Sequence, residues 1–111
     1  MKKKPHYLKV LISKEAIIIK LECTLRDVKY DPSNVIGINW FDVFIEDGDK
    51  ETVSKVFNDL FNDKTEEWKT FENDIRCMDG SHKLMDFTNE IVTVDGIKYL
   101  SSFGIEHLDN L

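Results

Sequence analysis

Two Asp-Gly dipeptides constrain the fold more than any other feature of this sequence. Asp79-Gly80 and Asp95-Gly96 separate three segments with strand-like composition, residues 68–78, 82–94 and 97–105. Asp and Gly both tolerate the positive φ angles that a two-residue hairpin turn requires, so this spacing predicts two consecutive β-hairpins. We therefore expect the C-terminal part of the chain to form three antiparallel strands.

An amphipathic helix is predicted before these strands, over residues 49–62. Its apolar side chains recur at helical spacing and share one face: Val53, Val56, Phe57, Leu60 and Phe61. Asp47 or Asp49 is expected to cap the helix, because acidic residues suit the positive end of its dipole. One helix cannot bury so large an apolar face alone, so we expect it to lie on the sheet.

The N-terminal part of the chain is predicted to add two strands and two short helices. Residues 7–12 and 16–20 have β-rich composition. Residues 22–28 fix no clear period, and we interpret them as a short irregular helix. Asp31-Pro32 predicts a helix of about one turn, with Asp as cap and Pro at the first helical position. Five strands and one main helix make a two-layer α+β domain.

Composition restricts the function classes. The 111 residues are enough for one domain, 1–111, with its core at about 7–108. The net charge is −6 and the only basic run is Lys2-Lys3-Lys4, which argues against nucleic acid as a partner. No apolar run approaches the ~20 residues that span a bilayer. Cys23 and Cys77 form no CxxC pair and fit a reducing cytosol, so we expect a cytoplasmic protein.

Several segments, in the right order, resemble PAS domains with their PAC motif, and the likeness covers residues 7–108. Residues 30–37 (YDPSNVIG) resemble the family's GYxxxELIG turn and helix. Residues 39–49 (NWFDVFIEDGD) resemble its WxxxxxPED segment, and residues 72–81 (ENDIRCMDGS) its ExxxxxxDGS hairpin. Phe87-Thr88-Asn89 stands where the family often has Trp-x-Asn.

The resemblance implies a five-stranded antiparallel sheet with one long helix and short helices packed on one face. It also implies a signal-transduction input domain that binds a small molecule or relays a conformational signal. The effector would be a kinase or a diguanylate cyclase in a longer chain. The alternative is a ligand-free module for dimerisation or protein interaction. We expect no enzyme, because no serine has His and Asp partners at a recognised spacing and no Gly-rich phosphate loop is present.

The same family suggests which cofactors to exclude. Its light-sensing flavin branch has a reactive Cys in GxNCRFLQ, where residues 37–44 here read GINWFDVF, with Trp40 in place of the Cys. A haem sensor would carry an axial His on or near the long helix, and residues 49–63 contain none. We expect neither haem nor covalent flavin. No metal site is expected either, because no zinc motif matches the three histidines, His6, His82 and His107.

Polar residues on the presumed inner face of the sheet mark the candidate ligand site. Asn89 alternates with Phe87 on one face of the middle strand, and we place Tyr99 and Ser101 on the inner face of the last strand. A buried polar group needs a hydrogen-bond partner, which here is a ligand, a water molecule or the protein itself. Phe57 of the long helix completes the candidate set.

The opposite face of the sheet is expected to support a homodimer. We assign Leu84 and Leu100 to that face, together with some of the N-terminal residues Tyr7, Leu8 and Val10. Apolar side chains on a solvent-facing sheet usually mark an interface. On this interpretation, Leu100→Glu should break the dimer.

Overall fold

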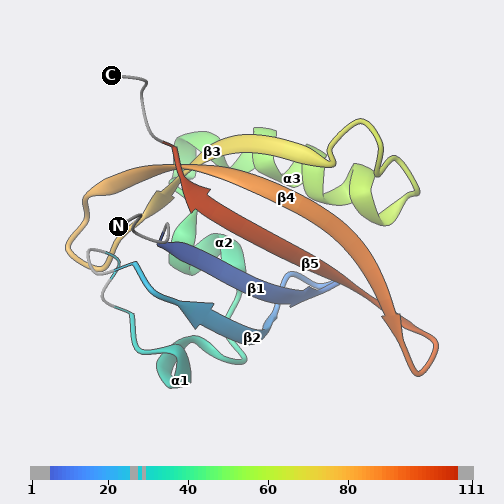
Figure 1. Cartoon of the computed structure of the whole chain (residues 1–111), viewed down its shortest axis with the longest axis horizontal. Helices are drawn as coiled ribbons and strands as arrows, with labels where there is room; N and C mark the ends of the chain where they lie inside the picture. Colours follow the sequence, from blue (N-terminus) through green and yellow to red (C-terminus); the bar gives the residue numbers. More distant parts are fainter. Residues whose placement is uncertain (1–5, 26–27, 29, 108–111) are drawn as a thin grey trace, which may run out of the picture.

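The computed structural model of the chain describes residues 6–25, 28 and 30–107. They form a five-stranded antiparallel sheet with helices packed on one face, as the sequence predicts, and the strand order is β2-β1-β5-β4-β3 (Figure 1). The elements are, in chain order, β1 (Tyr7–Ser13), β2 (Ile18–Cys23), α1 (Pro32–Val35), α2 (Trp40–Phe44), the 3-10 turn η1 (Asp47–Asp49), α3 (Lys50–Phe61), β3 (Thr70–Arg76), β4 (His82–Val94) and β5 (Ile97–Glu106).

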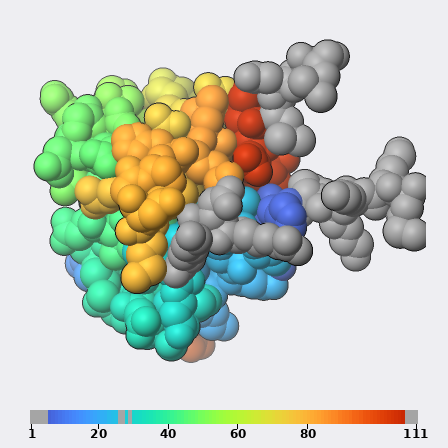
Figure 2. Space-filling view, turned by 90° about the vertical axis from the view of Figure 1, so that its left-hand side faces the viewer, coloured from blue at the N-terminus to red at the C-terminus, as the bar shows by residue number. Residues whose placement is uncertain are grey.

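The first and last strands lie side by side in the middle of the sheet. β1 pairs with β5 along its whole length, from Tyr7 opposite Ile105 to Ser13 opposite Tyr99. The start of β1 and the end of β5 therefore lie together at one end of the molecule (Figure 2). The chain leaves the sheet next to the point at which β1 begins.

Both predicted hairpins are confirmed. β3 and β4 pair up to Arg76 opposite His82, and Gly80 in the turn between them has a φ of 88°. β4 and β5 pair up to Val94 opposite Ile97, which leaves a two-residue turn. Asp95 and Gly96 in that turn have φ angles of 52° and 80°, the left-handed conformation that Asp and Gly tolerate best.

The long helix is confirmed as α3. Four of its five predicted apolar residues are buried against the sheet and α2, and Val53 is half-buried. Asp49 occupies the N-cap position, as expected, but its side chain makes no capping hydrogen bond. Asp47 instead pairs with Lys50 at 2.9 Å, and the hydrogen bond from Lys50 lowers the pKa of Asp47. No described helix has the length and apolar composition that crossing a lipid bilayer requires.

The expected helix at residues 22–28 is wrong in its described part. Glu22 and Cys23 belong to β2, where they lie opposite Lys9 and Leu8 of β1. β1 is an inner strand, and its backbone groups need partners on both sides. Pairing with β1 therefore extends β2 beyond the segment whose composition suggested a strand.

Two short helices follow β2. α1 is confirmed, with the Asp31 carboxylate accepting a 3.0 Å hydrogen bond from the Ser33 backbone N–H. α2 was not anticipated from the sequence. Asn39 caps α2 by accepting a 2.8 Å hydrogen bond from the Phe41 N–H. α2 and α3 lie on the same side of the sheet, behind it in Figure 1.

The expected orientation of the last strand is wrong. Leu100 and Ser102 of β5 face the core and are each only 5% exposed, whereas Tyr99 and Ser101 face the opposite side. Residues directly opposite one another on paired strands share a face, and Ser102 lies opposite the buried Asn89. Leu100 is therefore a core residue, and Leu100→Glu would disturb the core rather than report on a dimer.

Candidate ligand-binding site

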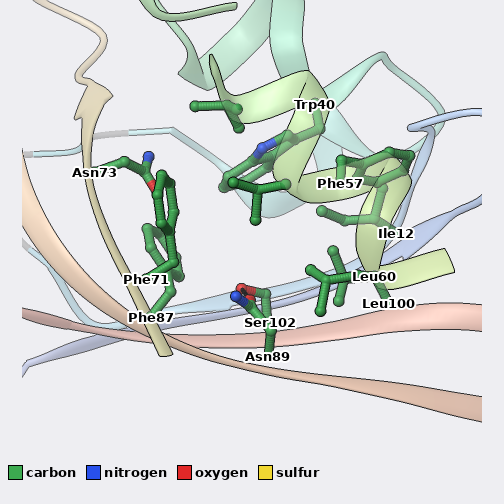
Figure 3. Close-up of a pocket in the computed structure, with 12 residues that line it drawn as sticks. Ile12, Trp40, Phe57, Leu60, Phe71, Asn73, Phe87, Asn89, Leu100 and Ser102 are labelled. Atoms are coloured by element: carbon green, nitrogen blue, oxygen red, sulfur yellow. Dashed lines mark hydrogen bonds between the residues drawn. The ribbon is translucent and has the colours of Figure 1, made fainter. Parts of the chain in front are cut away.

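A small internal cavity lies between α3 and the sheet, with Trp40 of α2 closing one side (Figure 3). Its volume is about 40 Å³. Since one water molecule needs roughly 10–15 Å³ of such space, the cavity holds a few waters or a very small molecule. Its lining is Ile12, Trp40, Val53, Val56, Phe57, Leu60, Phe71, Asn73, Phe87, Asn89, Leu100 and Ser102.

Aromatic and aliphatic side chains form most of the wall, and the aromatic ones contact rings from several elements. The ring centroids of Trp40 and Phe87 are 6.3 Å apart in an edge-to-face arrangement, which links α2 to β4 across the cavity. Phe57 of α3 packs on Phe41 and Phe61, with centroids 5.7 and 4.9 Å away. These contacts make the wall apolar and well packed, in the geometry that aromatic pairs prefer.

The sheet contributes the polar part of the lining. The Ser102 hydroxyl donates a 2.7 Å hydrogen bond to Oδ1 of Asn89, and Nδ2 of Asn89 donates a 3.0 Å bond to the carbonyl oxygen of Trp68. Asn89 and Ser102 are 7% and 5% exposed. Figure 3 shows both side chains on the sheet side of the cavity, across from Trp40 and Phe57. Their position next to an apolar space would let them anchor the polar group of a ligand.

The hydrogen-bonding capacity of this pair is only partly used. Asn Nδ2 carries two hydrogens, and a Ser hydroxyl oxygen has two lone pairs in addition to its hydrogen. One N–H of Asn89 and the lone pairs of Ser102 therefore remain for a ligand or water. Within the described residues, every buried polar side-chain atom already has a partner. A ligand would add to this network rather than complete it.

The described residues that line the cavity include no acid, base or cation. Asn73, the third polar residue, donates a 2.9 Å hydrogen bond from Nδ2 to the backbone carbonyl of Asp74. A charged group brought into such a site would lack an opposite charge and lose its hydration. The arrangement can therefore bind a neutral group, and it offers no acid or base for proton transfer.

The structure brings together three of the five residues predicted for the site. Phe57, Phe87 and Asn89 line the cavity. Tyr99 and Ser101 do not, because the register of β5 points them to the other face of the sheet. The prediction missed Ser102, the direct partner of Asn89.

The sequence carried a signal that could have found Ser102. A two-residue turn at Asp95-Gly96 places Val94 opposite Ile97. From there, each step back along β4 corresponds to one step forward along β5. Counting back from the turn pairs Asn89 with Ser102. The more apolar set of β5 residues, which includes Phe103, was taken for the core face and obscured this register.

Two of the three histidines, His82 and His107, have acidic neighbours. Nε2 of His82 lies 2.9 Å from Oε1 of Glu46. Nδ1 of His107 lies 2.9 Å from Oδ2 of Asp86 and 3.4 Å from Oε2 of Glu72. Sequence spacing could not reveal either group, because each joins segments that are far apart in the chain. Glu72, Asp86 and His107 are the described residues placed to hold a metal ion.

Both cysteines are free thiols in the structure. Cys77 is buried, and burial raises the pKa of the Cys23 thiol above its ordinary value. The raised pKa of Cys23 favours its unreactive protonated form over the thiolate, which is the nucleophile and metal ligand. Cys77 lies in the apolar core and Cys23 packs against it, so both thiols take part in packing as small apolar groups.

Comparisons with known proteins identify the fold and leave the sequence family open. No family model matches the sequence. No curated protein matches it either. Many solved structures match the fold, with low sequence identity.

Three of these structures illustrate the match. The Cronobacter turicensis RpfR quorum-sensing receptor PAS domain, in complex with BDSF, has a TM-score of 0.70 and 16% identity, covering 96% of this chain and 98% of that one. Drosophila melanogaster Cycle PAS-B, with bound ethylene glycol, has a TM-score of 0.69 and 11% identity over 90% of this chain and 99% of that one. A PAS domain from a two-component sensor histidine kinase has a TM-score of 0.67 and 10% identity over 91% and 85%.

The strand order and the helices on one face define a two-layer α+β domain. Together with these structural neighbours, they show that the chain has the fold of PAS domains.

Proposed function

We propose that this chain is the input domain of a signalling protein and that its cavity takes up a small neutral molecule. The observation that carries the proposal is the buried Asn89–Ser102 pair at the edge of an apolar cavity between α3 and the sheet. Ligand sites typically combine such an apolar lining with a few polar anchors. The domain would act without catalysis of its own.

The size of the cavity restricts the ligand. Typical ligand pockets measure about 300–1,000 Å³, far above the 40 Å³ present here. A molecule larger than a few atoms would have to displace the side chains of Phe57 and Trp40, and with them α3 and α2. Ligand uptake would therefore move the helices relative to the sheet, and this movement would be the signal that the domain passes on. The RpfR domain, which shares the fold, was also solved in complex with C12:0.

The effector is proposed to lie elsewhere in a longer protein. One structural neighbour comes from a two-component sensor histidine kinase and another from a quorum-sensing receptor. A sensor kinase or a diguanylate cyclase would fit this role, and the free thiols are compatible with a cytoplasmic location. We propose that the domain uses neither haem nor covalent flavin, because Trp40 replaces the reactive Cys of the flavin branch and α3 contains no His.

Native mass spectrometry of the purified domain tests the ligand proposal directly. We expect an added mass that is retained under gentle ionisation and lost on denaturation, or a rise in melting temperature when a library of small neutral molecules is screened. Ser102→Ala should weaken the binding and Ser101→Ala, on the opposite face, should not. Equal binding by both variants would place the ligand outside this cavity, and a visible absorption band would contradict the proposed lack of haem and flavin.

A second candidate function is dimerisation, with or without a ligand. Four residues form what we call the outer apolar patch, on the sheet face away from α3: Tyr7, Leu11, Phe103 and Ile105. The rings of Tyr7 and Phe103 stack with centroids 5.3 Å apart, and Phe103 remains 40% exposed. A second copy could cover this patch around a two-fold axis.

Sedimentation across a concentration series tests the dimer. Phe103→Glu should shift the equilibrium to monomer, because the interface would bury a carboxylate without a partner. Thr88→Glu adds the same charge at an exposed position opposite Phe103 on β4. This variant shows whether a negative charge on this face of the sheet is sufficient to dissociate the dimer. A strict monomer at the highest soluble concentration, or a dimer that Phe103→Glu leaves intact, would rule out this interface.

A further inference from the structure

Three potential metal ligands meet on the outer face of the sheet, away from the internal cavity. Glu72 lies on β3, Asp86 on β4, and His107 directly after β5. Glu72 is directly opposite Asp86, and the backbone N–H of His107 donates a 2.9 Å hydrogen bond to the carbonyl oxygen of Leu84. Strand pairing therefore holds the backbone of all three residues in place.

The distances within this group are close to those between ligands of one metal ion. Nδ1 of His107 lies 2.9 Å from Oδ2 of Asp86 and 3.4 Å from Oε2 of Glu72. The candidate ligand atoms of the three residues all lie within 4.8 Å of one another. At metal–ligand distances of about 2.0–2.2 Å, two ligands of one tetrahedral ion stand roughly 3.4 Å apart. Only small side-chain adjustments would be needed to surround an ion.

The charge balance also favours a cation. Two carboxylates directly opposite each other on paired strands repel and destabilise the sheet. Among the described residues, no Lys or Arg forms an ion pair with Glu72 or Asp86, and the only ion pairs of these carboxylates are with His107. The group carries a formal charge of −2 with a neutral imidazole and −1 with a protonated one. A divalent ion would compensate this charge.

We propose that Glu72, Asp86 and His107 form a binding site for a divalent first-row transition metal such as Zn²⁺. One imidazole nitrogen with two carboxylate oxygens suits such an ion, whereas Ca²⁺ takes six to eight oxygen ligands. Three protein ligands leave at least one coordination position for water or an external group. The site does not depend on a ligand in the cavity and goes beyond the proposed sensory function.

Metal binding would have a structural consequence. His107 is the point at which the described chain leaves β5, so a bound ion would tie this exit to the β3–β4 hairpin. A shallow groove on the same face is lined by Glu72 and Asp86 together with Phe103 and Ile105. An ion bound beside this groove would neutralise the two carboxylates on the outer face of the sheet.

Isothermal titration of the metal-free protein with ZnCl₂ at neutral pH tests the site. We expect one equivalent of Zn²⁺ per chain, with CaCl₂ and MgCl₂ binding at least ~10-fold more weakly. His107→Gln and the double variant Glu72→Gln/Asp86→Asn should each weaken Zn²⁺ binding at least ~10-fold, the scale that loss of a supporting metal contact reaches. His82→Gln is the matched control, because His82 is also an exposed His beside a carboxylate but has no second acidic neighbour in the described ion pairs. It should leave the affinity unchanged.

The double variant also guards against a folding artefact. Glu72 and Asp86 side chains are 53% and 45% exposed, and neutralising both removes their repulsion, so this variant should melt no lower than the metal-free native protein. A folded double variant that binds Zn²⁺ as tightly as the native chain would overturn the proposal. So would the absence of one-to-one binding in the native chain, in which case the three residues would form only a salt bridge.

Discussion

Phe87 and Gly104 lie directly opposite each other on β4 and β5, and a Cβ atom at position 104 would stand 2.5 Å from Cε1 of the Phe87 ring. The ring occupies the space that any other residue at 104 would need. Glycine is thus required by packing against a core aromatic ring that also lines the cavity. The Phe87 ring therefore contacts both the candidate cavity and the backbone of β5 at Gly104.

Gly104→Ala should destabilise the domain by about 1–3 kcal/mol, because an added methyl group in a packed core forces a side chain or the backbone to shift. Urea denaturation measures the change. Gly48→Ala is the control, since nothing lies within 4 Å of a Cβ atom built at that position. Equal stability of the two variants would mean that the Phe87 ring moves aside without cost.

Ser102→Ala should lower the free energy of unfolding by about 1–3 kcal/mol, because it leaves the buried Oδ1 of Asn89 without the hydroxyl that donates to it. Ser101→Ala removes the same hydroxyl from the neighbouring residue on the opposite face of the sheet. That variant should stay within about 0.5 kcal/mol of the native protein. Denaturant melts of the pair compare the two faces of β5 directly, and equal losses would contradict the observed register.

Phe57→Ala should cost about 3–5 kcal/mol, the range for an aromatic side chain lost from a core. Phe57 is 7% exposed and contacts the rings of Phe41 and Phe61. The comparison variant is Met78→Ala, because Met78 is 66% exposed and should cost no more than about 0.5 kcal/mol. A loss below about 1 kcal/mol for Phe57→Ala would be incompatible with its place in the core.

Asp59 should contribute to stability in a pH-dependent way. Nε1–H of Trp68 donates to its carboxylate at 2.9 Å and Lys55 at 3.0 Å, and these hydrogen bonds lower the pKa of Asp59, with the Trp68 bond as the larger cause. The folded-state pKa is therefore below the unfolded value of about 3.9. The stabilisation is present above that value and is lost as the pH falls through the folded-state pKa.

Asp59→Asn should accordingly be less stable than the native protein at pH 7, and the difference should shrink below about pH 4. Thermal melts at a series of pH values measure it. Asp63→Asn is the matched control, because the Asp63 side chain is 88% exposed and its ion pair with Lys98 is longer, at 3.5 Å. A deficit of Asp59→Asn that stays constant with pH would show that the carboxylate charge is not its cause.

Local patterns were sufficient for most of the elements. The two Asp-Gly turns, the apolar face of α3 and the Asp31 cap of α1 depend on residues close together in the chain, and all three are confirmed. The misassigned segment at 22–28 has no strong local preference. Two of its described residues, Glu22 and Cys23, pair with β1, the preceding strand, whose backbone groups need partners on both sides.

The candidate site was predicted only in part, because some of its residues are placed by contacts between distant segments. Phe57 and Asn89 were found from periodicity within one element, but Ser102 depends on the register between two strands. A strand with apolar residues on both sides does not reveal which side is buried. The apolar side chains of Phe103 and Ile105 suggested the wrong side, and only the pairing with β4 corrects it.

The sequence by itself determined the hairpins, the long helix and the α+β class, because turn chemistry and amphipathic spacing act over a few residues. The tertiary structure decided the position of β1 between β2 and β5, the buried face of β5, and the meeting of Glu72, Asp86 and His107. These features join residues that are far apart in the chain. Their proximity follows from strand pairing over the whole sheet, which buries the largest apolar surface, and no short stretch of sequence encodes it.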